Sequence, residues 1–100
     1  MKILHLNLTK KWFDMILSGE KKEEYRDHTD YWRKRLITKN GEWKKYDIIR
    51  FSNGYSKNRR QMDFPFITPE FGTGMEEWGA VPGKTYFVLT VLKMISTKNV

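Results

Sequence analysis

The segment Gly19-Glu20-Lys21-Lys22-Glu23-Glu24-Tyr25-Arg26 decides how the N-terminal third of the chain is interpreted. It fits the pattern G-x-K-x-x-E-x-R, in which a run of charged residues is followed by an aromatic residue and an arginine. Gly19 suits the position just after a helix, because glycine adopts the left-handed conformation that ends many helices. The segment is therefore expected to lead from a helix into a strand and to gather a Lys, a Glu and an Arg in a short stretch.

The residues around this segment predict the elements that it connects. Ile3–Leu8 alternates apolar and polar residues, which is typical of a half-buried strand. Lys10–Ser18 has apolar residues at positions i, i+3 and i+4, which predicts an amphipathic helix, and Thr9 can cap it. Glu23–Asp27 is expected to form the next strand.

Turn and strand signals divide the remaining chain into further elements. The expected elements are a short helix with a basic side at Tyr31–Leu36, capped by Thr29; a strand at Tyr46–Ser52; an edge strand at Met62–Ile67, where Pro65 lacks an N–H; a long loop at Thr68–Lys84; and a strand at Thr85–Ile95. No repeated βαβ pattern occurs, so a doubly wound parallel sheet is not expected. The order favours an α+β fold, with a small mixed sheet curled into a barrel and flanked by two short helices.

Length and composition restrict the class of protein. One hundred residues fit a single domain over 1–100, and no apolar run is long enough to span a bilayer. The absence of cysteine excludes disulfides and thiolate metal sites, and the N-terminal residues do not form a signal peptide, so a cytoplasmic protein is expected. The formal net charge of +7 favours a polyanionic partner, nucleic acid first.

The G-x-K-x-x-E-x-R pattern after a short strand and helix resembles the signature of the ASCH family, the activating-signal-cointegrator homology domains. The segments Arg50–Tyr55 and Trp78-Gly79-Ala80 also resemble parts of small bacterial and phage members. The resemblance implies a PUA-like β-barrel. It also implies that Lys21, Glu24 and Arg26 are functional positions, and that the ligand is RNA or a modified nucleotide.

The three motif residues have several chemical roles open to them. In an ideal strand Glu24 and Arg26 point to one face and Lys21 to the other, so Lys21 joins them only from a turn before the strand. Together they could grip a phosphate, or Lys21 could act as a general base or nucleophile with Glu24 as proton carrier. Exposed ion pairs of little energetic weight are the alternative interpretation.

The family resemblance also implies an enzymatic alternative. Some small members remove the acetyl group from N4-acetylcytidine with the motif lysine, a threonine three residues later and a distant glutamate. Lys21 matches the lysine, Glu24 departs from the threonine, and the candidates for the distant acid are Glu70, Glu76 and Glu77. Other members are RNA-binding modules or metal-independent ribonucleases acting on single strands.

Further basic and aromatic residues predict contacts to a nucleic acid. The expected ligand-contacting residues outside the motif are Arg50, Ser52, Asn53 and Tyr55 around a turn, and the basic loop residues Lys57, Arg59 and Arg60. A fourth basic cluster combines Trp32 with Arg33, Lys34 and Arg35. Tyr25, Tyr31, Trp43 and Tyr55 are candidates for stacking on bases. A solvated charged face and a hairpin turn are the structural interpretations of the same residues.

The remaining signals concern metals and partners. His5 and His28 lack metal-ligand spacing, so neither a metal site nor a cofactor is expected. The preferred hypothesis is RNA or modified-nucleotide binding, the second is hydrolysis, and the third is a non-catalytic protein-interaction module. A monomer or weak homodimer is expected, with the edge near Phe64–Ile67 as a route to pairing.

Overall fold

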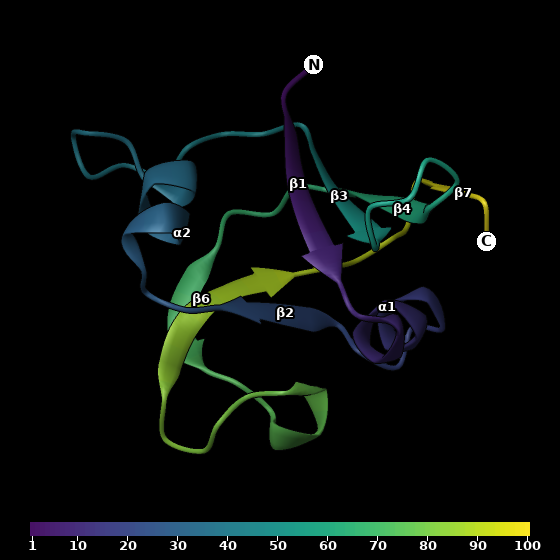
Figure 1. Cartoon of the computed structure of the whole chain (residues 1–100). Coiled ribbons are helices and arrows are strands. Elements are labelled where there is room, and N and C mark those ends of the chain that lie inside the picture. The colour runs from purple at the N-terminus through teal and green to yellow at the C-terminus, as the bar shows by residue number, and fades with distance from the viewer. The chain divides into compact units, whose positions relative to one another are not determined.

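The computed structural model describes residues 1–100 and contains two α-helices and seven β-strands in two sheets. The α+β class with two short helices is thereby confirmed (Figure 1). The elements are β1 Ile3–Leu8, α1 Lys10–Leu17, β2 Glu23–Arg26, α2 Asp30–Leu36, β3 Ile48–Asn53, β4 Arg60–Pro65, β5 Glu70–Thr73, the 3₁₀ turn η1 Glu76–Trp78, β6 Thr85–Thr90 and β7 Ser96–Lys98. No helix is long and apolar enough to cross a membrane.

The chain forms two compact units built from alternating segments. The first unit comprises Met1–Lys22, Tyr46–Phe66 and Val91–Val100, and the second comprises Glu23–Lys45 and Ile67–Thr90. The four-stranded sheet, in the order β1-β3-β4-β7, belongs to the first unit, and the three-stranded sheet, in the order β2-β6-β5, belongs to the second. The single domain over 1–100 and the closed barrel both stay predictions.

The first unit is organised around a parallel pair and a hairpin. β1 runs parallel to β3, β3 and β4 form an antiparallel hairpin, and β4 pairs on its other side with β7. The predicted alternation of β1 is confirmed, because its leucines Leu4, Leu6 and Leu8 are all buried. Phe13 and Ile16 of α1 are buried in the same unit.

The end of α1 determines where Lys21 lies. Gly19 has φ +85°, as expected for the residue that ends the helix. The backbone N–H groups of Ser18, Gly19 and Lys21 donate to the last helical carbonyls, those of Asp14, Ile16 and Met15. Lys21 is thus fixed through its own backbone. The expected side-chain cap by Thr9 is wrong, because Thr9 occupies the N-cap position without a side-chain hydrogen bond.

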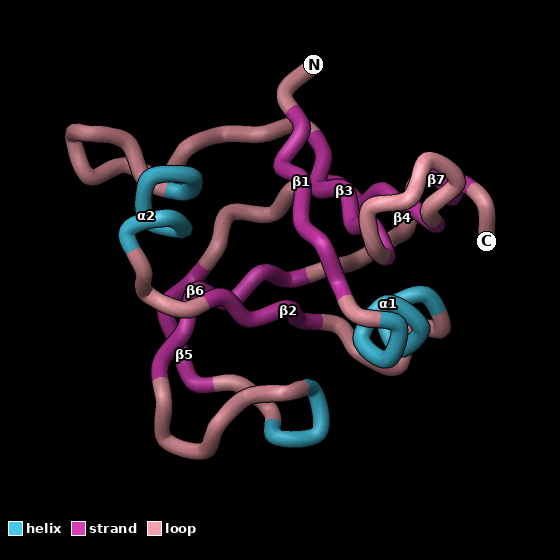
Figure 2. Tube along the Cα trace, viewed as in Figure 1, coloured by secondary structure: helices cyan, strands magenta, loops and turns pink.

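The second unit has β6 as its central strand, with β2 and β5 antiparallel on its two sides (Figure 2). Four consecutive residues of β6, Tyr86 to Leu89, are buried, which explains its nearly continuous apolar sequence. The predicted Thr29 cap of α2 is confirmed, since its hydroxyl accepts a hydrogen bond from the backbone N–H of Trp32 at 3.3 Å.

Three sequence-based expectations about the strands were wrong in part. The loop expected at Thr68–Lys84 contains β5 and η1, because backbone pairing with β6 makes a strand of a glycine-containing stretch. The strand expected over Thr85–Ile95 ends at Thr90, and Lys93 with φ 55° marks the bend before β7. β4 is an inner strand, although β7 pairs only with Gln61–Asp63 and leaves Pro65 without a second neighbour.

Candidate nucleic-acid interface

Lys21 of the motif is a buried residue of the first unit, with 2% of its surface exposed. Its ammonium lies 4.4 Å from the ring centroid of Trp12, and that of Lys11 lies 4.6 Å from the same ring. Trp12 therefore makes cation–π contacts with two ammonium groups. Lys21 also lines a 470 Å³ pocket with mostly apolar residues of the first unit, among them Ile16, Phe64 and Val91.

Glu24 and Arg26 lie in the second unit, on β2. They meet on one side of the strand, as the strand alternation predicts, with Arg26 Nη2 2.6 Å from Glu24 Oε2. The guanidinium of Arg26 lies 5.0 Å from the ring centroid of Trp32 in α2. Each motif cation, Lys21 in the first unit and Arg26 in the second, thus lies over a tryptophan of its own unit.

Tyr25, which lies between Glu24 and Arg26 in the sequence, is hydrogen-bonded to the loop before η1. Its hydroxyl donates to Glu23 at 2.7 Å and accepts from the backbone N–H of Met75 at 3.0 Å. Burial raises the pKa of the Tyr25 phenol, and the nearby carboxylate of Glu23 adds to the rise. These contacts give Tyr25 a structural role, in contrast to the expected role of stacking on a base.

The Arg50 guanidinium makes two hydrogen bonds to the Asp63 carboxylate, at 2.8 and 2.9 Å. Asp63 raises the pKa of Arg50 by these bonds. The pair borders a 310 Å³ pocket that is also lined by Gln61 and by residues of β7. Ser52 on the same strand is buried and accepts a hydrogen bond from Gln61 at 2.9 Å. Both side chains have internal partners, which favours the structural interpretation of them.

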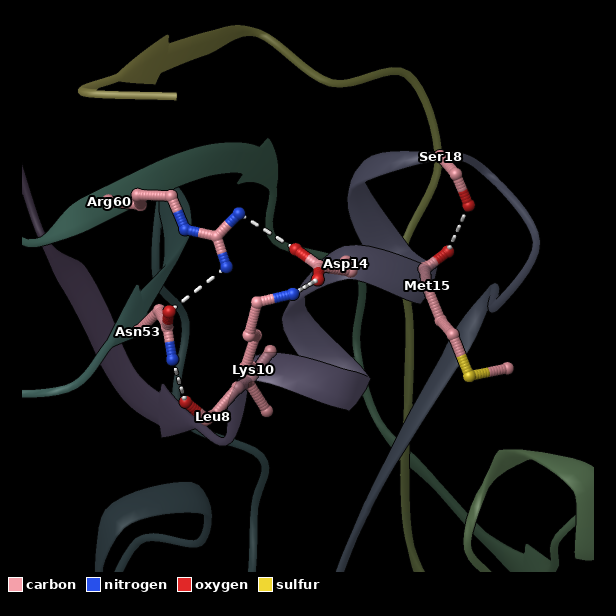
Figure 3. Close-up of polar contacts among 7 residues, drawn as sticks. All are labelled: Leu8, Lys10, Asp14, Met15, Ser18, Asn53 and Arg60. Atoms are coloured by element: carbon pink, nitrogen blue, oxygen red, sulfur yellow. Dashed lines mark hydrogen bonds and ion pairs between the residues drawn. The ribbon is translucent and has the colours of Figure 1, made fainter.

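Asn53 and Arg60 close the base of the β3–β4 hairpin. Asn53 donates to the carbonyl of Leu8 at 3.1 Å and accepts from Arg60 at 2.9 Å (Figure 3). Arg60 also pairs with Asp14 of α1 at 2.7 Å, and Asp14 accepts from Lys10 at 2.8 Å. Arg60 is the first residue of β4, which agrees with the early strand that was one of the two alternatives for the segment 56–60, the other being a basic loop.

The loop of this hairpin is exposed and carries the other predicted residues. Tyr55 has 88% of its surface exposed, and Lys57 is exposed as well. The guanidinium of Arg59 donates to the carbonyl of Ser56 at 3.2 Å within the loop. Asn7 of β1 holds the start of the loop through two hydrogen bonds with the backbone of Gly54, at 2.8 and 3.3 Å. Tyr55 and Lys57 are therefore presented to solvent from a fixed base.

The charges of the chain are divided unequally between the units. The first unit holds eleven of the nineteen Lys and Arg residues and four of the twelve Asp and Glu residues, so its net charge is +7. The second unit has eight of each sign and is neutral. The whole formal excess of positive charge thus belongs to the first unit. The lysines exposed there are Lys2, Lys10, Lys11, Lys22, Lys57, Lys93 and Lys98.

The basic residues of α2, in the second unit, lie partly against aromatic rings and are partly exposed. Arg35 lies over Tyr31 and Trp32, at 5.2 and 5.3 Å from their ring centroids, whereas Arg33 and Lys34 are exposed. Arg26 and Arg35 therefore both contact the ring of Trp32. This cluster supplies both an aromatic group and cations within the second unit.

Sequence reasoning missed an aromatic cluster in the second unit. Phe71 of β5 lies 5.1 to 5.3 Å from the rings of His28, Trp43 and Phe87, yet 55% of its surface is exposed. The cluster was missed because a loop was expected at this position, and Phe71 comes to lie opposite Phe87 only through the pairing of β5 with β6. Trp43 is in this way packed against other rings, in contrast to the exposed stacking role expected of it.

The three candidate acids for hydrolysis are all exposed. Glu70 is in β5, and Glu76 and Glu77 are in η1 of the second unit. No group of three or more His, Asp and Glu residues is placed to hold a metal ion. No family model, curated protein or solved structure matches the chain.

Proposed function

We propose that this chain is an ASCH domain with a PUA-like barrel that binds RNA in the cytoplasm. The observation that carries the proposal is that the entire net charge of +7 lies in the first unit. When such a concentration of Lys and Arg neutralises phosphates, counterions are released from the nucleic-acid backbone, and this release favours binding. The ASCH resemblance of the segment Gly19–Arg26 supports the same ligand class.

The surface that we assign to the RNA is the β3–β4 loop together with the start of α1. The Asp14–Arg60 pair and the Lys10–Asp14 pair connect these two regions. Tyr55 offers a ring on which an unpaired base can stack, and Lys57 offers an ammonium for a phosphate. In the motif, we assign Lys21 and the Glu24–Arg26 pair to nucleotide contacts made within their respective units.

A titration of short single-stranded RNA by fluorescence anisotropy, at several salt concentrations, tests the proposal. The native protein should bind, with an affinity that falls as salt rises. Lys57→Ala with Arg59→Ala should weaken binding about tenfold, because two cations beside Tyr55 are lost. The matched control, Lys45→Ala with Lys84→Ala, removes two cations from the neutral unit. Absence of RNA binding by the native protein would refute the proposal.

The buried position of Lys21 favours hydrolysis as a second candidate function. Lys21 lines a pocket of 470 Å³, which has the size for a small acylated nucleoside, and an amine can act there as a general base or nucleophile. Incubation with N4-acetylcytidine and with single-stranded RNA, followed by chromatography of the products, tests both substrates. Lys21→Met, which keeps most of the side-chain volume, should abolish turnover, whereas Lys2→Met, at an exposed position that does not line the pocket, should not. Turnover retained by Lys21→Met would exclude this mechanism.

A further inference from the structure

The second unit contains a groove of 640 Å³ along α2 and the segment that follows it. Four cationic side chains line the groove, those of Arg33, Lys34, Lys39 and Lys44, against the single carboxylate of Asp30. Ile37 and Thr38 complete the lining. Because long cationic side chains lay their aliphatic stems along a surface and keep their charges in water, the walls are apolar and the rim is positive.

The backbone around the groove is held at the C-terminal end of α2 and in the segment that follows it. Leu36 at the end of the helix is fully buried, and its carbonyl accepts a hydrogen bond from Lys44 N–H at 2.8 Å. Ile37 and Trp43 form an antiparallel bridge, and the ring of Trp43 packs 5.1 Å from that of Phe71. Lys44 therefore faces the groove from a segment that is anchored by hydrogen bonds and by an aromatic contact.

The charge of the groove differs from that of its unit. The second unit is neutral as a whole, but of its eight carboxylates only that of Asp30 lines the groove. Glu42 belongs to the segment after α2 but is not among the lining residues. The lining of the groove is therefore positive, with four cations against one carboxylate, although its unit is neutral. A solvated surface of mixed charges would not require this separation.

We propose that this groove binds the sugar–phosphate backbone of RNA, as a contact surface in addition to the hairpin loop of the first unit. The inference rests on the proposed function, because it names a second contact for the same ligand. The cations would bind phosphates, and the apolar walls would contact the sugars. Such contacts carry no sequence information, so the groove adds affinity without adding base specificity.

The experiment compares the salt dependence of RNA binding between the native chain and Arg33→Ala with Lys34→Ala. Each lost phosphate contact on a single strand lowers the slope of log K against log salt by about 0.7, so the double variant should lose about 1.4. Lys45→Ala with Lys84→Ala is the matched control, since it removes two cations of the same unit that do not line the groove. Its slope should equal that of the native chain.

Each outcome decides between the two proposals. If the native chain binds no RNA, the proposed function fails and this inference fails with it. If the native chain binds RNA and both double variants keep its slope, only the groove is refuted. Binding of anionic phospholipid vesicles that the groove variant loses, while RNA binding is unchanged, would assign the groove to a lipid surface and also overturn the inference. Thermal unfolding monitored by circular dichroism checks the fold of each variant, and Lys39→Ala with Lys44→Ala provides a second test if the first variant is unfolded.

Discussion

The guanidinium of Arg60 and the carboxylate of Asp14 lie 2.7 Å apart, and this ion pair joins β4 to helix α1. The same guanidinium lies over the face of Phe13, 4.5 Å from the ring centroid, and donates to Asn53 at 2.9 Å. Arg60 is thus held by a carboxylate, an amide oxygen and an aromatic ring. The hairpin base is fixed by these contacts, which leaves the loop residues beyond it available to a ligand.

We expect the ion pairs of Asp14 to make the stability of the fold depend on pH in the acid range. The hydrogen bond from Lys10, followed by that from Arg60, lowers the pKa of Asp14 below its usual 3.8. A carboxylate with a lowered pKa stabilises the fold above its unfolded-state value, and this contribution is lost as the pH falls through the lowered pKa. Urea unfolding between pH 2 and pH 6 should show a smaller decrease in midpoint below about pH 4 for Asp14→Asn than for the native chain. An identical decrease in both would contradict the assignment.

The Arg50–Asp63 pair predicts a loss of stability without a loss of RNA affinity. Asp63 is 8% exposed, so Arg50→Ala leaves a buried carboxylate without its two hydrogen bonds. The free energy of unfolding should fall by about 1–3 kcal/mol, as measured by urea denaturation. Arg50→Ala with Asp63→Ala should cost less than the sum of the two single substitutions, because no charge is left buried without a partner. RNA affinity reduced by Arg50→Ala at unchanged stability would assign Arg50 to the ligand instead.

The sequence predicted correctly those elements that are determined by residues close together in the chain. The alternating leucines of β1, the apolar spacing of α1 and Gly19 after it are all properties of neighbouring residues, and the structure confirms them. β5 and β7 were missed because their strand conformation comes from pairing with β6 and β4, which are distant in sequence. The two units could not be foreseen for the same reason, since each combines segments from separated parts of the chain.

The candidate site was predicted by residue type more successfully than by residue role. Glu24 and Arg26 meet as strand alternation predicts, and Tyr55 is exposed as a stacking residue must be. Arg50 and Arg60 were also expected to contact the ligand, but carboxylates engage both of them. Their partners Asp63 and Asp14 are 13 and 46 residues away, so the sequence gives no local signal of these ion pairs.

The position of Gly74 in the second unit has no room for a side chain. A Cβ atom at this position would lie 2.5 Å from the Tyr25 ring and 2.7 Å from the Cβ of Ala80. Gly74→Ala should therefore destabilise the fold by about 1–3 kcal/mol, measured by chemical denaturation. Gly72→Ala is the control, because its nearest contact would be Val88 at an ordinary 3.8 Å. Equal stability of the two variants would show that the Tyr25 ring moves aside without cost.

Tyr55 should contribute to RNA affinity and not to the stability of the protein. Because 88% of its surface is exposed, Tyr55→Ala removes little buried area and should leave the unfolding midpoint unchanged. Stacking of a base on an aromatic ring contributes about 1–3 kcal/mol, so the substitution should weaken single-stranded RNA binding by about 5- to 150-fold. Tyr55→Phe keeps the ring and should retain most of the affinity, which separates stacking from hydrogen bonding by the hydroxyl. The measurement is anisotropy with RNA that contains 2-aminopurine, whose fluorescence changes when it stacks. Native affinity in Tyr55→Ala would show that the loop binds RNA only through its charges, and the salt dependence of that variant would then equal that of the native chain.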